Sequence, residues 1–479
     1  MKRACGVLAP VSALPSGFSC GCFGEHTKKF IDKIAECGFS YWQTLPLSVT
    51  DAFHSPYSSP SAFSGSPWLL DLAHFKDFGW MTEEEWWQAK EHISYACEFE
   101  RLENERELLL FRIARRADQK AEIEQFFHEH PYSEELCRFM ALRKANGGAP
   151  WRTWQSDMAD GETLYAFGFG QMHFFRQWDE IRMHAAEKGV RIIGDIPIYV
   201  AYESADVYFH SALFDLAEDG APRGVAGVPP DYFSEDGQLW GNPLYRWDKM
   251  AEDGYLWWQD RVKHSLSLFD GVRLDHFRGF DTYYEIPAGA ESAREGKWHK
   301  GPGCPFIDML KECFGSALFI AEDLGEKMST VEALLAYSGF PGMRVLSFAF
   351  DGESNSAHLP HEYPANAVAY TGTHDNNTLL GYLYSLGPEK RGEIFDYCHY
   401  RGEDITTGCR YALETMYASH ADLVIFPLQD LLFFGEDTRI NTPGRADGNW
   451  RFRVTAEQLD SLDMRFFSHL AARYGRMPS

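Results

Sequence analysis

The sequence has no long hydrophobic run and no excess of positive charge. These two absences argue against a membrane-spanning protein and against binding to nucleic acid or anionic lipid. No stretch approaches the roughly 18 apolar residues that a membrane-spanning helix needs. Lys and Arg number 45 against 70 Asp and Glu, so the formal net charge is −25. Nucleic acid and anionic lipid are bound through clustered positive charge, and neither is expected as a partner. We expect a soluble, cytoplasmic monomer or small homo-oligomer that acts on a neutral or cationic substrate.

Cysteine is sparse and carries no metal-binding pattern. Ten cysteines are scattered through 479 residues, and the close pairs are Cys20/Cys22 and Cys304/Cys313. Neither pair belongs to the repeated C-x₂-C spacing of a zinc site. Reduced thiols of the cytosol are the simpler interpretation. We therefore predict no metal and no other cofactor.

The N-terminal residues imitate a secretory signal in part. Lys2 and Arg3 precede an apolar stretch, as in the basic and apolar regions of such signals. Pro10 and Pro15 interrupt that stretch, however, and no small-x-small cleavage site follows it cleanly. We favour the alternative, in which Gly6–Leu8 is a buried strand.

Short, continuously apolar runs recur between helical stretches. Runs of this kind are typical of parallel strands that are buried on both faces. Eight of them separated by helices predict an α/β fold, a (β/α)₈ TIM barrel. We expect one catalytic domain over residues 1–479. The predicted strands are Gly6–Leu8, Tyr41–Leu45, Arg191–Asp195, Gly271–Asp275, Leu318–Glu322, Arg344–Phe350, Ala367–Thr371 and Asp422–Phe426.

The uneven spacing of these strands predicts a first large insertion after the second strand, at about 76–170. Thr82 and Glu85 have the spacing of a capping box, which begins a helix. The segment that follows is rich in Glu, Arg, Leu and Ala. We therefore expect this insertion to be mostly helical.

A second insertion is predicted after the third strand, at about 200–260. It contains Gly224–Tyr245, where Gly, Pro and Asp are frequent. Such residues favour an irregular loop. Tyr232, Phe233 and Trp240 add large apolar surfaces to it. Because long irregular loops are often functional, we expect this one to cover the substrate as a lid.

Three acidic residues stand at the ends of predicted strands: Asp275 ends the fourth, Glu322 ends the fifth and Asp375 follows the seventh. The catalytic groups of a (β/α)₈ barrel stand at the carboxyl ends of its strands. A single Asp after a strand is more often a helix N-cap. Three acids in register, with aromatic residues nearby, favour a catalytic site.

The neighbours of these acids predict different roles for them. Arg273 and Asp275 are two residues apart on a strand and share a face. A buried cation keeps a carboxylate ionised, as a nucleophile requires, although a purely structural ion pair is the alternative. Opposite an ionised Asp275, the pKa of Glu322 should be raised, which suits a general acid. A nucleophile and a general acid whose carboxyl groups lie about 5–5.5 Å apart are typical of a retaining glycosidase. Asp375 would then form hydrogen bonds with sugar hydroxyls.

Aromatic residues near these acids favour a sugar substrate. A sugar ring has hydroxyls and a flat apolar face, so its groove combines polar groups with aromatic rings. Tyr57 follows the second strand and Trp240 lies in the predicted lid. Packing in the core is an equal alternative for Tyr57. His374 is either a donor to a sugar hydroxyl or a residue that shapes the turn.

Three motifs resemble the catalytic motifs of the amylomaltases, the 4-α-glucanotransferases also called disproportionating enzymes. They are Gly271-x-Arg273-x-Asp275-His276-Phe277, Ala321-Glu322-Asp323-Leu324-Gly325 and Thr373-His374-Asp375-Asn376. Further blocks resemble the family in the same order along nearly the whole chain: Tyr41-Trp42-Gln43-x-Leu45-Pro46-Leu47, Ser55-Pro56-Tyr57-Ser58, Gly194-Asp195-x-Pro197-Ile198-Tyr199-Val200, Pro229-Pro230-Asp231-x-Phe233-Ser234, Gly237-Gln238-x-Trp240-Gly241-Asn242-Pro243 and Pro341-Gly342-Met343-Arg344-Val345-Leu346.

The resemblance implies a cofactor-free transfer between an α-1,4-glucan donor and a glucan acceptor. It implies that Asp275 is the nucleophile, Glu322 the acid/base and Asp375 the stabiliser of the transition state. The sequence departs from the family pattern at Ser347, where a Gln is usual, and at Arg445, where a Thr is usual. The substrate-binding residues that we expect are Arg273, His374, Tyr57, Asp195, Trp240, Asn242 and Pro243.

Two other functions remain open at this point. An α-1,4-glucan hydrolase uses the same three acids and differs only in whether water or a sugar reaches the intermediate. A non-catalytic glycan-binding barrel belongs to another class, and the intact set of three acids argues against it.

Overall fold

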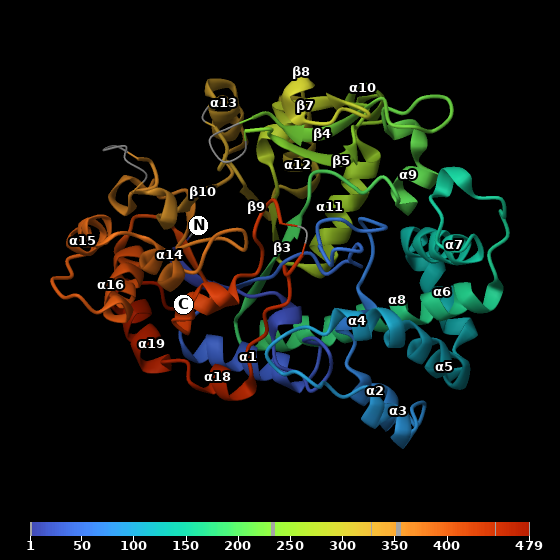
Figure 1. The fold of residues 1–479 in the computed structure, drawn as a ribbon, viewed down its shortest axis with the longest axis horizontal. Coiled ribbons are helices and arrows are strands. Elements are labelled where there is room, and N and C mark those ends of the chain that lie inside the picture. The colour runs from blue at the N-terminus through green and yellow to red at the C-terminus, as the bar shows by residue number, and fades with distance from the viewer. Residues whose placement is uncertain (1, 231–234, 327, 351–355, 446, 479) are drawn as a thin grey trace.

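The computed structural model describes residues 2–230, 235–326, 328–350, 356–445 and 447–478. Its centre is a closed barrel of eight parallel strands in the order β1–β12–β11–β10–β9–β6–β3–β2 (Figure 1). This confirms the predicted (β/α)₈ barrel, with the N-terminal segment as its first strand. The strands are β1 (Ala4–Leu8), β2 (Tyr41–Gln43), β3 (Arg191–Ile196), β6 (Gly271–Leu274), β9 (Leu318–Ala321), β10 (Gly342–Val345), β11 (Ala367–Tyr370) and β12 (Leu423–Pro427).

The sixth barrel strand ends earlier than predicted. We predicted Arg344–Phe350, but β10 stops at Val345 and a 3₁₀ helix, Leu346–Phe348, follows. Val345 pairs with Tyr370, the last residue of β11. The hydrogen bonding between β10 and β11 therefore ends where β11 ends. The apolar sequence continues beyond this point but is not part of the strand.

Both faces of the barrel strands are buried. Val368 and Tyr370 of β11 pack inside the barrel with Ile425 of β12, whereas Ala369 and Val424 pack against the surrounding helices. This two-sided burial explains why the strands are continuously apolar in the sequence. Because side chains fill the interior, a substrate must bind at an end of the barrel.

Helices surround the barrel. Those of at least seven residues outside the helical insertion are α1 (Glu25–Glu36), α8 (Gly161–Glu187), α11 (Leu256–Leu268), α12 (Cys304–Phe314), α13 (Ser329–Ser338), α14 (Leu379–Ser385), α15 (Pro388–Tyr397), α16 (Ile405–Ala418) and α19 (Met464–Arg473). Shorter helices are α9 (Ala205–Phe209), α10 (Trp247–Ala251), α17 (Leu428–Leu431) and α18 (Ala456–Asp460). Among the described residues, no helix has both the length and the apolar character needed to cross a bilayer.

The first insertion is mostly helical, as predicted. Thr82 and Glu85 form the capping box that begins α3: the Glu85 amide donates to Thr82 Oγ1 at 3.2 Å, and the Thr82 amide donates to Glu85 Oε2 at 3.0 Å. Figure 1 shows α5 (Glu107–Ala117), α6 (Lys120–Glu129) and α7 (Pro131–Ala145) at the right side of the molecule. The helices before α8 are α2 (Leu72–Asp77), α3 (Glu83–Gln88), α4 (Phe99–Arg101), a π-helix (Leu102–Arg106), α5 (Glu107–Ala117), α6 (Lys120–Glu129) and α7 (Pro131–Ala145).

The prediction of an irregular second insertion was wrong for its described residues. Its segment contains two antiparallel strands, β4 (Gly224–Val228) and β5 (Gln238–Pro243), and β4 also pairs with β7 (Thr282–Pro287). With β8 (Lys297–Lys300) they form a four-stranded sheet, ordered β5–β4–β7–β8, at the top of Figure 1.

Glycine permits this strand pairing rather than preventing it. A Cβ on Gly227 would lie 2.2 Å from the carbonyl oxygen of Gln238 on β5. Only glycine allows the two backbones to come so close. Tyr232 and Phe233, which we expected in the lid, lie outside the described residues.

Candidate active site

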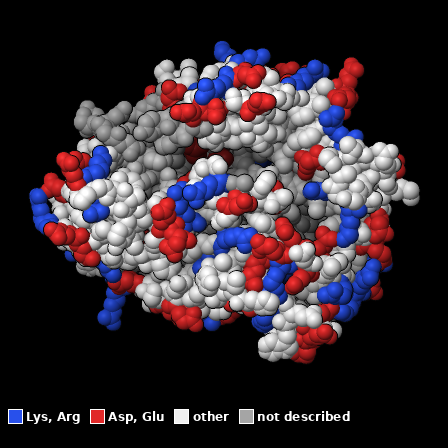
Figure 2. Space-filling view, in the orientation of Figure 1, with Lys and Arg blue, Asp and Glu red and all other residues white. Residues whose placement is uncertain are grey.

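A cleft of about 1140 Å³ opens at the carboxyl ends of the barrel strands. Asp275 directly follows β6, Glu322 directly follows β9, and Asp375 lies five residues beyond β11. The cleft is lined by eight of the ten residues that the sequence singled out: Tyr57, Trp240, Asn242, Arg273, Asp275, Glu322, His374 and Asp375. The other two, Asp195 and Pro243, do not line it. Figure 2 shows acidic and basic side chains mixed over one face of the molecule, which is hollowed near its centre.

Asp275 is held from inside the barrel by a chain of charges. Arg273 Nη2 lies 2.8 Å from Asp275 Oδ1, and Arg273 Nη1 lies 2.7 Å from Asp195 Oδ2. The Asp195 side chain is 0% exposed, so it supports Arg273 from behind. The Asp275 amide donates to the carbonyl of Ile196 on β3 at 3.0 Å, which fixes the backbone. Asp275 is thus a partly exposed carboxylate beside a buried cation.

Glu322 is oriented by two backbone amides. His276 N donates to Glu322 Oε2 at 2.9 Å, and Leu324 N donates to Oε1 at 2.8 Å. Burial of the carboxyl is the main reason that the pKa of Glu322 is raised to about 7; the positive charge of Arg273 opposes this shift, and the negative charge of Asp275 adds to it. A group with this pKa exchanges a proton readily near neutrality, as a general acid/base must.

Asp375 lies on the loop after β11 and is held by a distant part of the chain. Asn441 Nδ2 donates to Asp375 Oδ1 at 2.6 Å, and Arg439 Nη2 donates to the Asp375 carbonyl at 3.0 Å. His374 Nε2 lies 3.4 Å from Asp375 Oδ2. The Asp375 side chain is 42% exposed, so it can reach a ligand in the cleft.

Tyr57, His374 and Trp450 form one wall of the cleft. The Tyr57 hydroxyl donates to Asp195 Oδ2 at 2.8 Å, and burial raises the pKa of Tyr57 well above its usual value. The rings of Tyr57 and His374 are stacked with centroids 5.0 Å apart, and Trp450 lies 5.9 Å from Tyr57. This wall combines aromatic surface with hydrogen-bonding atoms, as a sugar site requires.

The insertion sheet reaches the cleft through β5. Trp240 is 37% exposed, and its ring lies 5.0 Å, edge to face, from the ring of His276. Burial lowers the pKa of His276 to about 4, so its ring is neutral near pH 7. Asn242 donates to the carbonyl of Val200 at 2.8 Å. Pro243 is buried and pairs with β4, so we correct its expected contact with substrate to a structural one.

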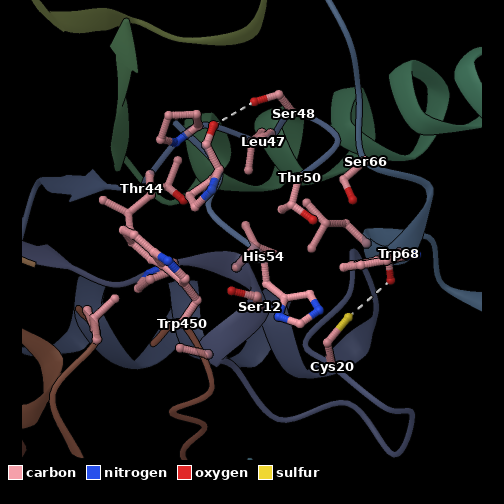
Figure 3. Close-up of a pocket in the computed structure, with 18 of the residues that line it drawn as sticks. Ser12, Cys20, Thr44, Leu47, Ser48, Thr50, His54, Ser66, Trp68 and Trp450 are labelled. Atoms are coloured by element: carbon pink, nitrogen blue, oxygen red, sulfur yellow. Dashed lines mark hydrogen bonds between the residues drawn. The ribbon is translucent and has the colours of Figure 1, made fainter. Parts of the chain in front are cut away.

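A separate cavity of about 50 Å³ lies beside Trp450 (Figure 3). Trp450 lines both this cavity and the cleft. The hydroxyls of Thr44 and Thr50 in its wall make no hydrogen bond to the described protein atoms. A cavity of this size has room for water but not for a sugar ring. The large cleft is therefore the candidate substrate site.

No group of three or more His, Cys, Asp or Glu side chains suited to a metal ion occurs among the described residues. All ten cysteines are free thiols, eight buried and two exposed.

Sequence reasoning missed several residues of this site. Asn441, Arg439 and Trp450 come from the C-terminal segment after β12, and no further barrel strand that would have marked them occurs in the described part of that segment. His276 was visible only as a neighbour of Asp275 in a motif. Its backbone is left-handed, with φ of 49°, and its amide donates to Glu322.

A family model described as 4-alpha-glucanotransferase matches residues 9–459. The 4-alpha-glucanotransferase of Thermus thermophilus is 39% identical over 96% of both chains, and that of Aquifex aeolicus is 38% identical over 99% of both. The family match covers both insertions and every barrel strand except β1.

Solved structures agree with the sequence relatives. The amylomaltase of Streptococcus agalactiae, in complex with acarbose, superposes with a TM-score of 0.95 over 100% of both chains at 33% identity. The amylomaltase of Corynebacterium glutamicum has a TM-score of 0.80 at 19% identity, covering 99% of this chain and 75% of that one. At that identity the second likeness concerns the fold alone.

Proposed function

This chain belongs to the family of 4-alpha-glucanotransferases, and from that premise we propose how its own residues transfer α-1,4-glucan segments between oligosaccharides. The proposal rests on one observation above all. Three acids from the ends of three different barrel strands line the same cleft. We assign Asp275 as nucleophile, Glu322 as acid/base and Asp375 as stabiliser of the transition state.

In the first step, Asp275 attacks the anomeric carbon of the donor glucan. The bond from that carbon to the glycosidic oxygen breaks, and Glu322 gives its proton to the leaving oxygen. The pKa of about 7 leaves Glu322 partly protonated at neutral pH, and Arg273 keeps Asp275 beside a positive charge. The product is a glycosyl ester on Asp275.

In the second step, the 4-hydroxyl of an acceptor glucan attacks the same carbon. Glu322, now ionised, accepts the hydroxyl proton, and Asp275 leaves as a carboxylate. Two inversions retain the anomeric configuration. Asp375 stabilises positive charge on the ring in both transition states, because preorganised charge is most effective where solvent is limited.

Transfer exceeds hydrolysis only when a sugar hydroxyl reaches the intermediate before water does. Trp240 projects from the insertion sheet at the edge of the cleft, against His276. We assign it the role of stacking on the acceptor and excluding water. Arg273, His374, Tyr57 and Asn242 complete the binding surface.

Incubation with maltotriose tests the proposal. The enzyme should release glucose and build longer maltodextrins while the total number of reducing ends stays nearly constant. A steady rise in reducing ends with no product longer than maltotriose would identify a hydrolase. Binding of maltodextrin without any product would identify a non-catalytic glycan-binding barrel.

The covalent intermediate can be sought separately. With Glu322→Gln and an activated glycosyl fluoride, which needs no acid to leave, the ester on Asp275 should accumulate. Intact mass spectrometry should show the adduct, and its absence under every condition would exclude Asp275 as the nucleophile.

A cytoplasmic location and a monomeric or small oligomeric state are parts of this proposal. Ten free thiols suit a reducing compartment. Cell fractionation and light scattering test the two points.

A further inference from the structure

Asp430 lies beneath the loop that carries Asp375 and takes no part in the proposed chemistry. It belongs to α17, the short helix after β12, and is 2% exposed. Asp430 Oδ2 accepts a hydrogen bond from Thr371 Oγ1 at 2.5 Å, and Oδ1 accepts one from the Leu379 amide at 2.7 Å. Thr371 directly follows β11, and Leu379 is the first residue of α14. One carboxyl group therefore holds both ends of the segment 372–378.

Packing alone does not require a carboxyl group at this position. A buried polar group is costly unless it is hydrogen-bonded, and Asp430 forms no ion pair within the described part of the chain. Burial raises the pKa of Asp430 to about 6, against the opposing effect of its two hydrogen bonds. An apolar side chain would fill the space without that cost. The two hydrogen bonds are therefore what this carboxyl adds to the site.

The segment between the two attachment points is braced internally. The Thr373 amide donates to Asn376 Oδ1 at 2.8 Å, and the Asp375 amide donates to Thr373 Oγ1 at 3.3 Å. A segment with such internal bonds moves as a unit, so fixing its ends fixes its apex. The apex carries His374 and Asp375, both of which line the cleft.

We propose that Asp430 is a positioning residue for Asp375: by holding Thr371 and Leu379, it places the loop 372–378 so that the Asp375 carboxylate meets the sugar ring in the transition state. This inference rests on the proposed function of Asp375. It is independent of Asn441, which holds the same carboxylate from the cleft side.

Two substitutions of Asp430 separate its hydrogen bonds from its volume. Asp430→Leu fills the space but accepts no hydrogen bond. Asp430→Asn can keep both bonds, because its oxygen accepts from Leu379 N and its amide donates to Thr371 Oγ1. Thr371→Val removes only one of the two bonds and serves as the second variant if Asp430→Leu does not fold.

The control for lost stability is Glu85→Ala, in the remote helix α3. It removes a capping box and the ion pairs of Glu85 with Arg112 and Arg116, so it should lower the melting temperature without changing kcat. Each variant is assayed with maltotriose for kcat and KM, and hydrogen exchange is measured over residues 372–379.

For Asp430→Leu we expect kcat to fall about 10- to 100-fold with KM changed less than about threefold, because a misplaced stabiliser costs more in the transition state than in the ground state. Exchange over 372–379 should rise. Asp430→Asn should keep kcat within about threefold of wild type, and Thr371→Val should lose about 3- to 10-fold.

The inference is overturned if Asp430→Leu, or Thr371→Val in its place, keeps wild-type kcat, or if Asp430→Asn loses as much as Asp430→Leu. Asp375→Asn is assayed in parallel. An active Asp375→Asn would refute the proposed function itself, whereas an inactive Asp375→Asn beside an active Asp430→Leu or Thr371→Val would refute only the role of Asp430.

Discussion

The end of β6 and the loop after β11 each present an aspartate to the same cleft, but they hold it in different ways. Asp275 is held by Arg273 of the same strand, which is supported by Asp195 of the neighbouring strand. Asp375 is held by the neutral amide of Asn441, which lies 66 residues further along the chain. The Asp275 carboxylate is held by a charged side chain from within the barrel, whereas the Asp375 carboxylate is held by a neutral amide from outside it, and the Arg439 guanidinium contacts only the Asp375 carbonyl.

This difference matches the two roles that we assign. A nucleophile must be ionised and rigid, and a buried cation on a strand provides both conditions. A stabiliser must contact the sugar ring in the cleft, and Asp375 lies on a loop where its side chain is more exposed, 42% against 28% for the Asp275 side chain. The following predictions test each side of this comparison.

The largest effect is expected at the end of β6. Asp275→Asn removes the nucleophile and leaves the volume unchanged, so turnover of maltotriose should fall by about 1,000-fold or more. Circular dichroism should match wild type. If more than a few per cent of the activity remains, Asp275 is not the nucleophile.

A smaller loss of activity is expected when the support of Asp375, on the loop after β11, is removed. Asn441→Ala removes the donor to Asp375 Oδ1, and kcat for maltotriose should fall about 10- to 100-fold. Asn449→Ala is the matched control: Asn449 accepts from the Thr442 amide on the same segment but makes no hydrogen bond to Asp375. Equal losses in both variants would show that the segment, and not the bond to Asp375, matters.

Glu322 should make both rate and stability depend on pH. Its pKa of about 7 predicts that kcat/KM falls up to about tenfold per pH unit above neutrality, as the general acid loses its proton. Between the ordinary Glu pKa of 4.5 and about 7, the folded state binds the extra proton, so the free energy of unfolding should decrease as pH rises.

Glu322→Gln tests the second part of that prediction. The variant cannot titrate, so its free energy of unfolding should fall less between pH 5 and pH 8 than that of wild type. Chemical denaturation at several pH values measures this difference, and parallel curves for the two proteins would contradict the assignment of the raised pKa.

The smallest effect is expected at the insertion sheet. Trp240→Ala should leave cleavage largely intact and raise the share of hydrolysis about two- to fivefold, since only acceptor stacking and water exclusion are lost. The ratio of new reducing ends to transfer products measures this share. Leu239→Ala is the control, because Leu239 is exposed on the same strand but does not line the cleft.

Much of the barrel could be predicted because its signals are local. All eight strands were found, since continuous apolar runs report burial on both faces. The proximity of Arg273 to Asp275 also followed from the two-residue period of a strand. The ends of β10 and the pairing of β4 were missed, because the length of a strand depends on its neighbour and a glycine-rich segment pairs only when a partner backbone comes close.

The sequence by itself determined where the barrel strands lie along the chain and which three acids stand at their ends. Both signals are local, because burial on two faces and backbone periodicity are recorded within a few residues. Only the tertiary structure decided which distant residues support those acids. Asn441 reaches Asp375, and Asp430 reaches Thr371 and Leu379, across 51 to 66 residues of chain. Contacts over such separations depend on barrel closure and on the packing of whole segments, which no local pattern records.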